Sequence, residues 1–273
     1  MMDDSSNRID PAIRVSRVSH SFGNEGDRRR VNALRETSLD IRRGELMCFI
    51  GPSGCGKSTL LNIIGGLLTP TSGEVEVAGK PVDGPMPADM AFVFQENALF
   101  PWYTVLENII VGLSFQGVAK QDRDARALAA LETVGMPGFA NHYPSQLSGG
   151  MKQRVALARA LSLQTDILLM DEPFAALDEQ TRMVLGEDLS QLLHRADKTI
   201  LFVTHSLGEA VFLADRVAVF SARPGVIKTI IDVDEPHPRT PAFVKSEKFN
   251  RLRNELYDLL HDEIRKTVIL TAA

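Results

Sequence analysis

A glycine-rich stretch at residues 51–59 constrains what this chain can fold into more than any other part of its sequence. It fits the pattern G-x-x-x-x-G-K-[ST]. Residues 46–50 before it form an apolar run short enough for a buried strand, and residues 60–68 after it are apolar with a rhythm compatible with a helix. Strand, glycine-rich turn and helix in this order predict a phosphate-binding loop, or P-loop. Its residues are Gly51, Pro52, Ser53, Gly54, Cys55, Gly56, Lys57, Ser58 and Thr59.

The residue types in this loop suit a nucleotide with its magnesium ion. Glycines let backbone N–H groups turn inward around phosphate oxygens, and the N-terminus of the next helix adds its dipole. Lys57 can reach the β- and γ-phosphates, and the Ser58 hydroxyl suits Mg²⁺, which prefers oxygen ligands. The alternative is a glycine-rich turn with a chance Lys-Ser pair. The flanking strand and helix argue against it.

Strand and helix patterns alternate through most of the chain. Residues 13–20, 31–41 and 74–78 have strand character and predict a small antiparallel element beside the nucleotide. Later apolar runs are separated by helical segments, which predicts a mostly parallel sheet covered by helices. These runs are residues 90–94, 167–170, 199–203 and 217–220. We therefore expect an α/β fold with a P-loop NTPase core of the RecA-like kind, a small antiparallel β subdomain and an inserted helical subdomain at about residues 100–160.

The two ends of the chain differ in character from its middle. Residues 1–10 are polar and are expected to be a disordered tail, so that the main domain spans residues 11–225. Residues 226–273 form an extension whose apolar side chains recur at helical spacing. They predict a terminal amphipathic helix that packs on its own domain rather than on a partner. These apolar residues are Phe249, Leu252, Leu256, Leu259, Leu260 and Ile264.

Composition argues against several classes of protein. The formal net charge of −5 is unlike that of a general nucleic-acid binder. Cys48 and Cys55 lie in the predicted buried strand and in the P-loop, where a structural disulfide does not fit, so a reducing compartment is expected. The N-terminus does not resemble a secretory signal, and no run approaches the ~18 apolar residues of a membrane span. We expect a soluble protein whose membrane role comes through a partner.

Two carboxylates, Asp171 and Glu172, follow the apolar strand at residues 167–170. Because consecutive strand residues point in opposite directions, the two acids are expected to do different work. Asp171 would hold Mg²⁺ through water, and Glu172 would poise the attacking water near the γ-phosphate. An Asp-Glu pair after a strand is common by chance, but its presence in one chain with a P-loop favours the catalytic interpretation.

Residues 147–154, Leu-Ser-Gly-Gly-Met-Lys-Gln-Arg, resemble the LSGGQ signature of the ATP-binding cassette ATPases. Ser148, Gly149 and Gly150 at the start of a helix make a second anion-binding nest. In the family, the signature of one subunit caps the ATP on the P-loop of the other, so the resemblance implies a head-to-tail dimer with two ATP molecules. Met151 stands in place of the signature Gln. Since Ser148 and both glycines remain, capping is expected to survive.

The resemblance spans about residues 13–220 and implies roles for other positions. Gln95 resembles the Q-loop glutamine, which senses the γ-phosphate and Mg²⁺ and faces the membrane partner. His205 resembles the switch histidine at the γ-phosphate, whereas a lone histidine is more often structural. Asp178 resembles the D-loop aspartate that acts across the dimer. Phe22 lies where the family places an aromatic that stacks on adenine, and a core phenylalanine is the alternative.

The resemblance thus implies an ATPase with ATP and Mg²⁺ as its cofactors. The expected catalytic residues are Lys57, Gln95, Glu172 and His205. The expected magnesium ligands are Ser58, Gln95 and Asp171. The expected nucleotide contacts are the whole P-loop, Phe22, Gln95, Ser148, Gly149, Gly150 and Asp178.

Residues 99–109 and 214–225 resemble a subgroup of the family, the bacterial importer ATPases for nitrate, sulfonate, taurine and bicarbonate. This implies a peripheral protein at the cytoplasmic face of the inner membrane, with permease subunits, a second ATPase subunit and, indirectly, a solute-binding protein. The alternative is a non-transport ATPase that clamps nucleic acid or a protein complex, against which the acidic charge and single cassette argue. A nucleotide-binding regulator without turnover is disfavoured by the intact Glu172 and His205.

Overall fold

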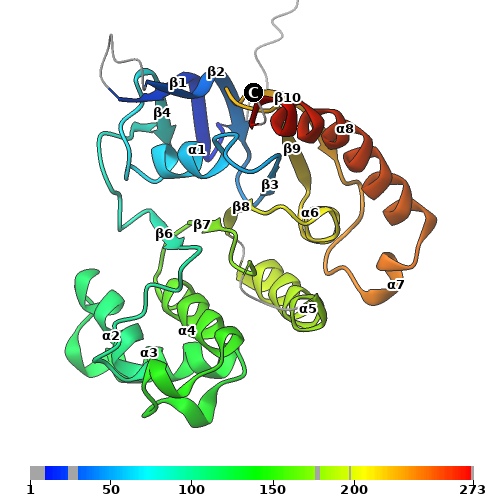
Figure 1. Cartoon of the computed structure of the whole chain (residues 1–273). Coiled ribbons are helices and arrows are strands. Elements are labelled where there is room, and N and C mark those ends of the chain that lie inside the picture. The colour runs from blue at the N-terminus through cyan, green and yellow to red at the C-terminus, as the bar shows by residue number, and fades with distance from the viewer. Residues whose placement is uncertain (1–9, 24–29, 176–178, 197, 272–273) are drawn as a thin grey trace, which may run out of the picture.

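The computed structural model describes residues 10–23, 30–175, 179–196 and 198–271. Within these ranges the strands form a six-stranded sheet and a four-stranded sheet. Figure 1 shows the four-stranded sheet near the top and a separate group of helices, drawn in green, at the lower left. The predicted α/β fold with a P-loop core, an antiparallel part and a helical insertion is confirmed.

The larger sheet is built around β3 (Leu46–Ile50), the strand before the P-loop. Every residue of β3, β7 (Ile167–Asp171) and β8 (Thr199–Val203) is buried. Both faces of these strands are covered, which explains their continuous apolar runs. The strand order is β10 (Ile227–Asp232), β9 (Arg216–Phe220), β3 (Leu46–Ile50), β8 (Thr199–Val203), β7 (Ile167–Asp171) and β6 (Met90–Val93). All neighbours run parallel except β10, which pairs antiparallel with β9.

Successive residues of β3 enter two different cores. Met47 and Phe49 pack into the core shared with the smaller sheet and with α1 (Lys57–Ile64). Cys48 and Ile50 pack into the core that reaches the helical insertion and the C-terminal helix. The central strand therefore joins both halves of the hydrophobic interior, with its C-terminal end leading directly into the P-loop.

The four-stranded sheet is antiparallel, as expected, but its first strand is irregular. Ile13 and Val15 are buried in alternation, and the alternation then shifts at Arg17, whose φ is +47°. The shift returns Val18 to the core, and such irregularities bend a strand. The strand order is β2 (Val31–Ile41), β1 (Ile13–Phe22), β4 (Ser72–Val77) and β5 (Lys80–Pro81).

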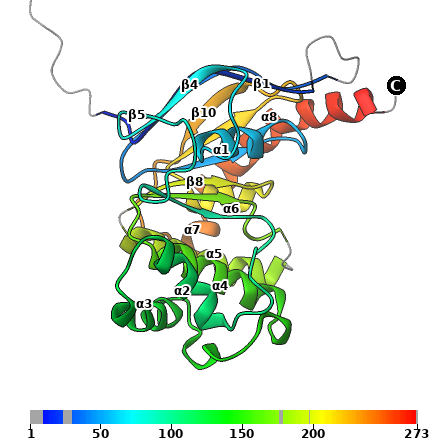
Figure 2. The same cartoon turned by 90° about the vertical axis from the view of Figure 1, so that its left-hand side faces the viewer.

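The helical insertion lies between β6 and β7, as predicted. Figure 2 shows its helices as a layer below the larger sheet. Its elements are α2 (Val105–Phe115), α3 (Lys120–Thr133), the 3₁₀ turns η1 (Pro137–Phe139) and η2 (Pro144–Gln146), and α4 (Gly149–Ser162). A capping box starts α2, because Thr104 and Glu107 each accept a hydrogen bond from the other's backbone N–H.

Asn108, which is fully buried in α2, holds the loop before that helix. Its side-chain amide donates to the carbonyl groups of Phe100, Tyr103 and Thr104, and its oxygen accepts from the N–H of Phe100. The loop is thereby ordered while Trp102 stays 66% exposed. A rigid aromatic surface results at this corner of the helical insertion.

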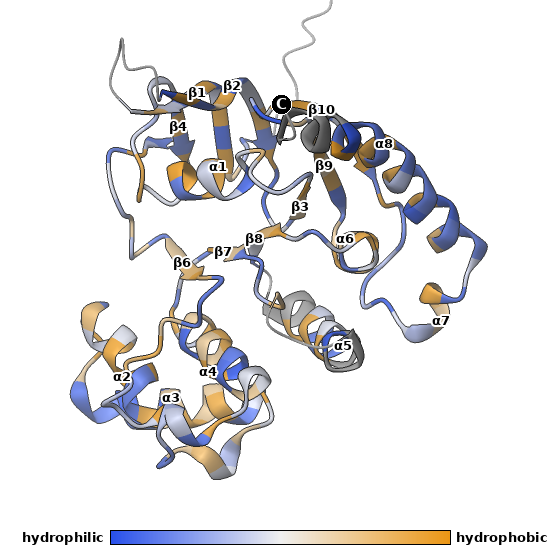
Figure 3. Ribbon diagram, in the orientation of Figure 1, coloured by the Kyte–Doolittle hydropathy of each residue, from blue (hydrophilic) through white to orange (hydrophobic). Residues whose placement is uncertain are grey.

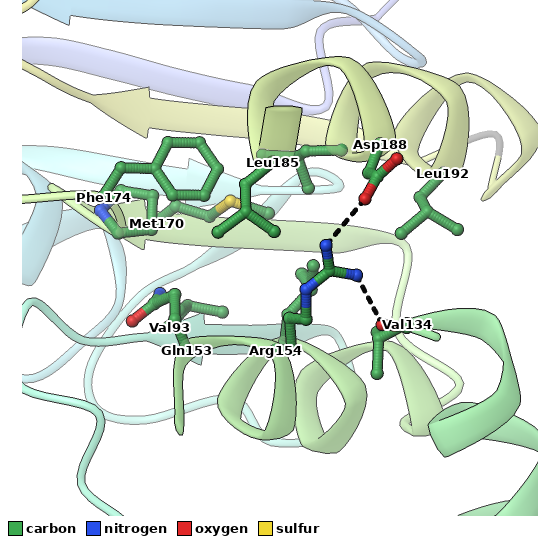
Figure 4. A pocket seen from close by; sticks show the side chains of 12 residues that line it. Val93, Val134, Gln153, Arg154, Met170, Phe174, Leu185, Asp188 and Leu192 are labelled. Atoms are coloured by element: carbon green, nitrogen blue, oxygen red, sulfur yellow. Dashed lines mark hydrogen bonds and ion pairs between the residues drawn. The ribbon is translucent and has the colours of Figure 1, made fainter. Parts of the chain in front are cut away.

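Two helices follow strands of the larger sheet, α5 (Glu179–Ala196) and α6 (Leu207–Leu213). Arg154 on α4 connects the helical insertion to α5 (Figure 4). Its guanidinium donates to the Val134 carbonyl and to Asp188 of α5, each at 2.8 Å. The apolar side chains around this pair leave a cavity of only about 20 Å³. Helix α4 is therefore braced against α5.

The chain beyond residue 225, predicted to be an extension outside the main domain, is built into the same sheet through β10. Two further helices follow, α7 (Pro241–Val244) and α8 (Glu247–Thr271). Arg239, only 3% exposed, donates to the carbonyl groups of Val211, Phe212 and Ala214 at the end of α6. These carbonyls have no hydrogen-bond partner within the helix, so the arginine caps the C-terminus of α6.

The terminal helix α8 packs on its own domain, against α6. Phe249, Leu252, Leu256 and Leu260 are buried, and hydrophobic and hydrophilic residues alternate around its turns in Figure 3. Ile264, expected on the same face, is instead 49% exposed. In the part of the chain that is described, no helix combines the length and apolarity needed to cross a membrane.

Candidate active site

The candidate site lies at one edge of the larger sheet, where parallel strands end. The P-loop follows β3, and Gln95 follows β6. Asp171 ends β7 and Glu172 comes directly after it, while His205 follows β8. Carboxyl ends of parallel strands meet at one edge, so residues far apart in sequence come together there.

The P-loop wraps tightly around its own lysine. Gly54 and Gly56 have φ values of +72° and +102°, a region that side-chain-bearing residues rarely adopt. Lys57, only 5% exposed, donates to the carbonyl groups of Gly51 at 2.8 Å and Pro52 at 3.1 Å. The ammonium group is thus held by carbonyl groups of its own loop.

A cavity of about 440 Å³ opens over the P-loop. Its size is in the usual range for small-molecule sites. Phe22 lines it and is 46% exposed, unlike the core phenylalanine considered as an alternative, and its ring packs edge-on against His20 with centroids 4.6 Å apart. The lining residues are Phe22, Val31, Ala33, Ser53, Gly54, Gly56, Lys57, Ser58, Thr59, Gln95, Glu172 and Arg223.

Ser58 and Asp171 form the oxygen pair expected for magnesium. The Ser58 hydroxyl donates to Asp171 Oδ1 at 2.8 Å. Burial raises the pKa of Asp171 above its usual value, and the hydrogen bond from Ser58 opposes that rise. A hydroxyl and a carboxylate side by side are the hard ligands that Mg²⁺ prefers, so these residues fit the ion.

Glu172, Gln95 and His205 converge on one oxygen atom. Glu172 Oε2 lies 3.3 Å from His205 Nδ1 and 3.4 Å from Gln95 Nε2. The backbone of Glu172 has φ +43°, and its N–H donates to the Val203 carbonyl of β8. Such a conformation is strained for a residue with a side chain and is found where function requires a fixed direction. The carboxylate turns toward the cavity as a result.

Glu209 on α6 supports the histidine loop and was not predicted from the sequence. It accepts a hydrogen bond from the Thr204 hydroxyl at 2.5 Å and pairs with Arg182 at 3.3 Å. Burial raises the pKa of Glu209 above its usual value, an effect that the Thr204 bond opposes. The pattern Thr-His-Ser before a short helix carries no sign of this contact, because a glutamate in the first turn of a helix is common.

A turn at residues 221–226, between β9 and β10, backs the P-loop. Gly225 donates to the Ala33 carbonyl, and its own carbonyl accepts from Arg35. A Cβ atom on Gly225 would lie 1.8 Å from the carbonyl oxygen of Cys55. Only glycine can bring this turn so close to the P-loop backbone.

Gly225→Ala is therefore expected to disturb the P-loop. We expect a loss of about 1–3 kcal/mol in the free energy of unfolding, the usual cost of overpacking, measured by urea denaturation. Nucleotide affinity should fall as well, since Cys55 must move. Gly138→Ala is the matched control, because nothing lies within 4 Å of its new Cβ. Equal stability of the two variants would contradict the steric argument.

The signature residues lie elsewhere, at the start of α4. Ser148 caps this helix by accepting from the Met151 N–H at 3.3 Å, and Ser148 and Gly149 are exposed. None of these residues lines the cavity described above, and Figure 1 shows α4 well apart from α1. Asp178, assigned to the D-loop, lies outside the described residues.

Known proteins resemble this chain in sequence and in structure. Residues 34–175 match the family described as ABC transporter. An uncharacterized ABC transporter ATP-binding protein of Methanocaldococcus jannaschii is 45% identical over 96% of this chain and 96% of its own length. The nitrate import ATP-binding protein NrtD of Synechocystis sp. is 45% identical over 86% of this chain and 90% of its own length. The taurine import ATP-binding protein TauB of Rhizobium johnstonii is 43% identical over 85% of this chain and 90% of its own length.

A solved structure extends the likeness to three dimensions. It is a dimeric ATP-binding cassette in a post-hydrolysis state, bound to ADP and Pi. The two chains share 33% sequence identity and superpose with a TM-score of 0.73 over 82% of this chain and 100% of the other.

Proposed function

Because the chain belongs to the ABC transporter family and is an ATPase of that family, we propose that it energises the import of a small solute. The observation that carries this proposal is its likeness, over 85% of the chain or more, to ATP-binding proteins named for nitrate and taurine import. The importer resemblance of residues 99–109 and 214–225 supports the same proposal. The class of solute we infer is a small molecule or ion such as nitrate, taurine or another sulfonate.

We assign the cavity residues to the steps of ATP hydrolysis. Lys57 and the N–H groups of the P-loop bind the β- and γ-phosphates, and Phe22 stacks on the base. Glu172 accepts a proton from the water that attacks the γ-phosphorus, while Gln95 and His205 hold its carboxylate and that water in place. The convergence of both side chains on Glu172 Oε2 supports these roles.

We place Mg²⁺ on Ser58, Asp171 and Gln95. Bound there, the ion would supply positive charge against the phosphate oxygens of the nucleotide. Ser58 offers its hydroxyl, and Asp171 offers a carboxylate that must be charged to act. Because burial raises the pKa of Asp171, this carboxylate becomes protonated at a higher pH than an exposed aspartate does. Affinity for magnesium should therefore weaken as the pH falls through that range.

We propose that two ATPase subunits, copies of this chain or a similar one, close head to tail over two ATP molecules. The exposed Ser148 and Gly149 of one subunit cap the γ-phosphate held by Lys57 of the other, and Asp178 acts across the same interface. The separation of the signature from the cavity within one chain and the dimeric form of the related cassette support this arrangement. Hydrolysis removes the bridging phosphate and reopens the pair.

We infer permease subunits as the membrane partner and a peripheral position at the cytoplasmic face of the membrane. The ordered aromatic loop around Trp102 lies near the end of β6 in sequence, where Gln95 senses the nucleotide. A surface there transmits closure of the dimer to the permease. A solute-binding protein acts indirectly and supplies the specificity that this chain does not carry.

The proposal is tested by capturing the closed complex. Glu172→Gln protein is expressed in its native cells, extracted with mild detergent in ATP and Mg²⁺, and analysed by mass spectrometry. We expect a multi-span membrane protein to be recovered with it and to be depleted with the Lys57→Ala control, which cannot close on ATP. A solute-binding protein recovered alongside is then screened against nitrate, taurine, other sulfonates and bicarbonate. Recovery of nucleic acid or a soluble complex alone would overturn import in favour of a mechanical clamp.

A further inference from the structure

Arg223 lines the nucleotide cavity, although its place in the sequence indicates no role for it. Its side chain is exposed, and within the described ranges no hydrogen bond or ion pair engages its guanidinium. We propose that Arg223 is a nucleotide-binding residue whose guanidinium contacts the phosphates of ATP, and that helix α8 sets its position through Glu263. The inference rests on the nucleotide site proposed above and adds a cation to it.

The turn that carries Arg223 is held from several sides. The Ser221 N–H donates to the Val226 carbonyl at 2.9 Å, and the Ser221 hydroxyl accepts from the Val226 N–H at 3.1 Å. Gly225 is fastened to β2 through Ala33 and packs on the P-loop. Arg223 thus projects from a turn whose backbone is already ordered, so a ligand that binds its guanidinium has only the side chain left to order.

Glu263 of α8 anchors the residue next to Arg223. Its carboxylate, only 3% exposed, accepts from the Ala222 N–H at 2.8 Å and pairs with Lys228 at 2.9 Å. A buried carboxylate is costly unless it is paired, and here the partners are the turn itself and β10. The terminal helix therefore has a specific contact to the loop that lines the nucleotide cavity.

Charge favours phosphate as the group that Arg223 contacts. Lys57, the other cationic side chain among the described lining residues, already donates to two carbonyl groups, and Glu172 adds a negative charge that repels phosphate. A guanidinium has a planar set of donors that matches phosphate oxygens and stays charged at any pH the protein meets. Arg223 offsets the carboxylate and completes the positive side of the site.

Nucleotide binding tests the first part of the proposal. Dissociation constants for ATP, ADP and adenosine are measured by displacement of a fluorescent ADP analogue from the purified full chain. We expect Arg223→Ala to weaken ATP and ADP about tenfold, a change of about 1.4 kcal/mol, while Arg223→Lys retains most of the affinity. Adenosine, which has no phosphate, should bind the parent and Arg223→Ala equally. Arg253→Ala, which removes an exposed arginine from α8, is the control and should match the parent.

The outcomes separate this inference from the site on which it rests. Weaker adenosine binding by Arg223→Ala would assign the arginine to the nucleoside and overturn the phosphate contact. If Lys57→Ala loses ATP binding while Arg223→Ala does not, the nucleotide site stands and the role of Arg223 fails. If neither variant changes affinity, the nucleotide site itself is wrong.

A double-mutant cycle tests the positioning role of Glu263. We expect Glu263→Ala to weaken ATP binding by about threefold in the parent and to have no effect on ATP affinity in Arg223→Ala protein, because the two act through one contact. Glu263→Gln keeps an acceptor for the Ala222 N–H and should restore most of the affinity. A loss of affinity that is equal in both backgrounds would show a general effect on folding and overturn the link from α8 to Arg223.

Discussion

Glu172→Gln should abolish ATP turnover while leaving ATP binding intact. Glutamine keeps the shape of the side chain and an oxygen for Gln95 and His205, but it cannot take the proton of the attacking water. Loss of a general base typically lowers the rate by about 10²–10⁴-fold. Lys57 and the P-loop are untouched, so affinity for ATP should stay within about twofold of the parent. Steady-state phosphate release and equilibrium binding of a fluorescent nucleotide measure the two quantities.

The matched control for this substitution is Glu132→Gln, an exposed glutamate on α3. It loses the same charge far from the cavity and should hydrolyse ATP like the parent. Turnover by Glu172→Gln within about threefold of the parent would show that another group activates the water, since a true general base contributes far more. The strained backbone at Glu172 would then need a different explanation.

Ser148→Arg should prevent two subunits from closing over ATP. The exposed start of α4 offers N–H groups and the positive end of the helix dipole to an anion. An arginine there fills the space that the partner's γ-phosphate would occupy and adds a positive charge where the dipole is already positive. We expect the ATP-dependent dimer of the Glu172→Gln protein to be lost and turnover on the parent background to fall by about 10²-fold or more.

Sedimentation velocity with ATP and Mg²⁺ reads out this dimer directly. Nucleotide affinity of each subunit should be unchanged, because Ser148 does not line its own cavity. Gln121→Arg adds the same charge at an exposed position of α3, and this protein should still form the ATP-dependent dimer. A normal ATP-dependent dimer in the Ser148→Arg protein would contradict capping of the phosphate by the signature.

The parts of the fold that could be predicted are those whose signal is local. The strand Leu46–Ile50 is a short apolar run with a glycine turn on each side, and a buried parallel strand has to look like that. Strand β10 was missed because it lies at the sheet edge and is only half-buried, so its sequence does not stand out. The shift at Arg17 also has no local cause in the sequence; it follows from pairing with two neighbours.

The same distinction applies to the candidate site. Ser58, Asp171 and Glu172 belong to short contiguous patterns, and the structure brings them to one edge of the sheet. Gly225 and Arg223 lie far from the P-loop in sequence and approach it only through tertiary contacts. Glu209 is close to His205 in sequence, but its side-chain contacts with Thr204 and Arg182 leave no recognisable pattern there. The segment around Gly225 resembles the importer ATPases, but nothing in its sequence indicates that it lies against Cys55.

The central place of β3 has a consequence for how the protein is synthesised. Its hydrogen-bonding neighbours are β8 and β9, both of which leave the ribosome long after it. Until then a five-residue apolar strand and the nascent P-loop have no sheet to join. Non-local pairing of this kind is slow and leaves strand edges exposed. The newly made chain therefore leaves β3 without its sheet neighbours until its last third has emerged, and we expect products truncated before β8 to lack an ordered P-loop.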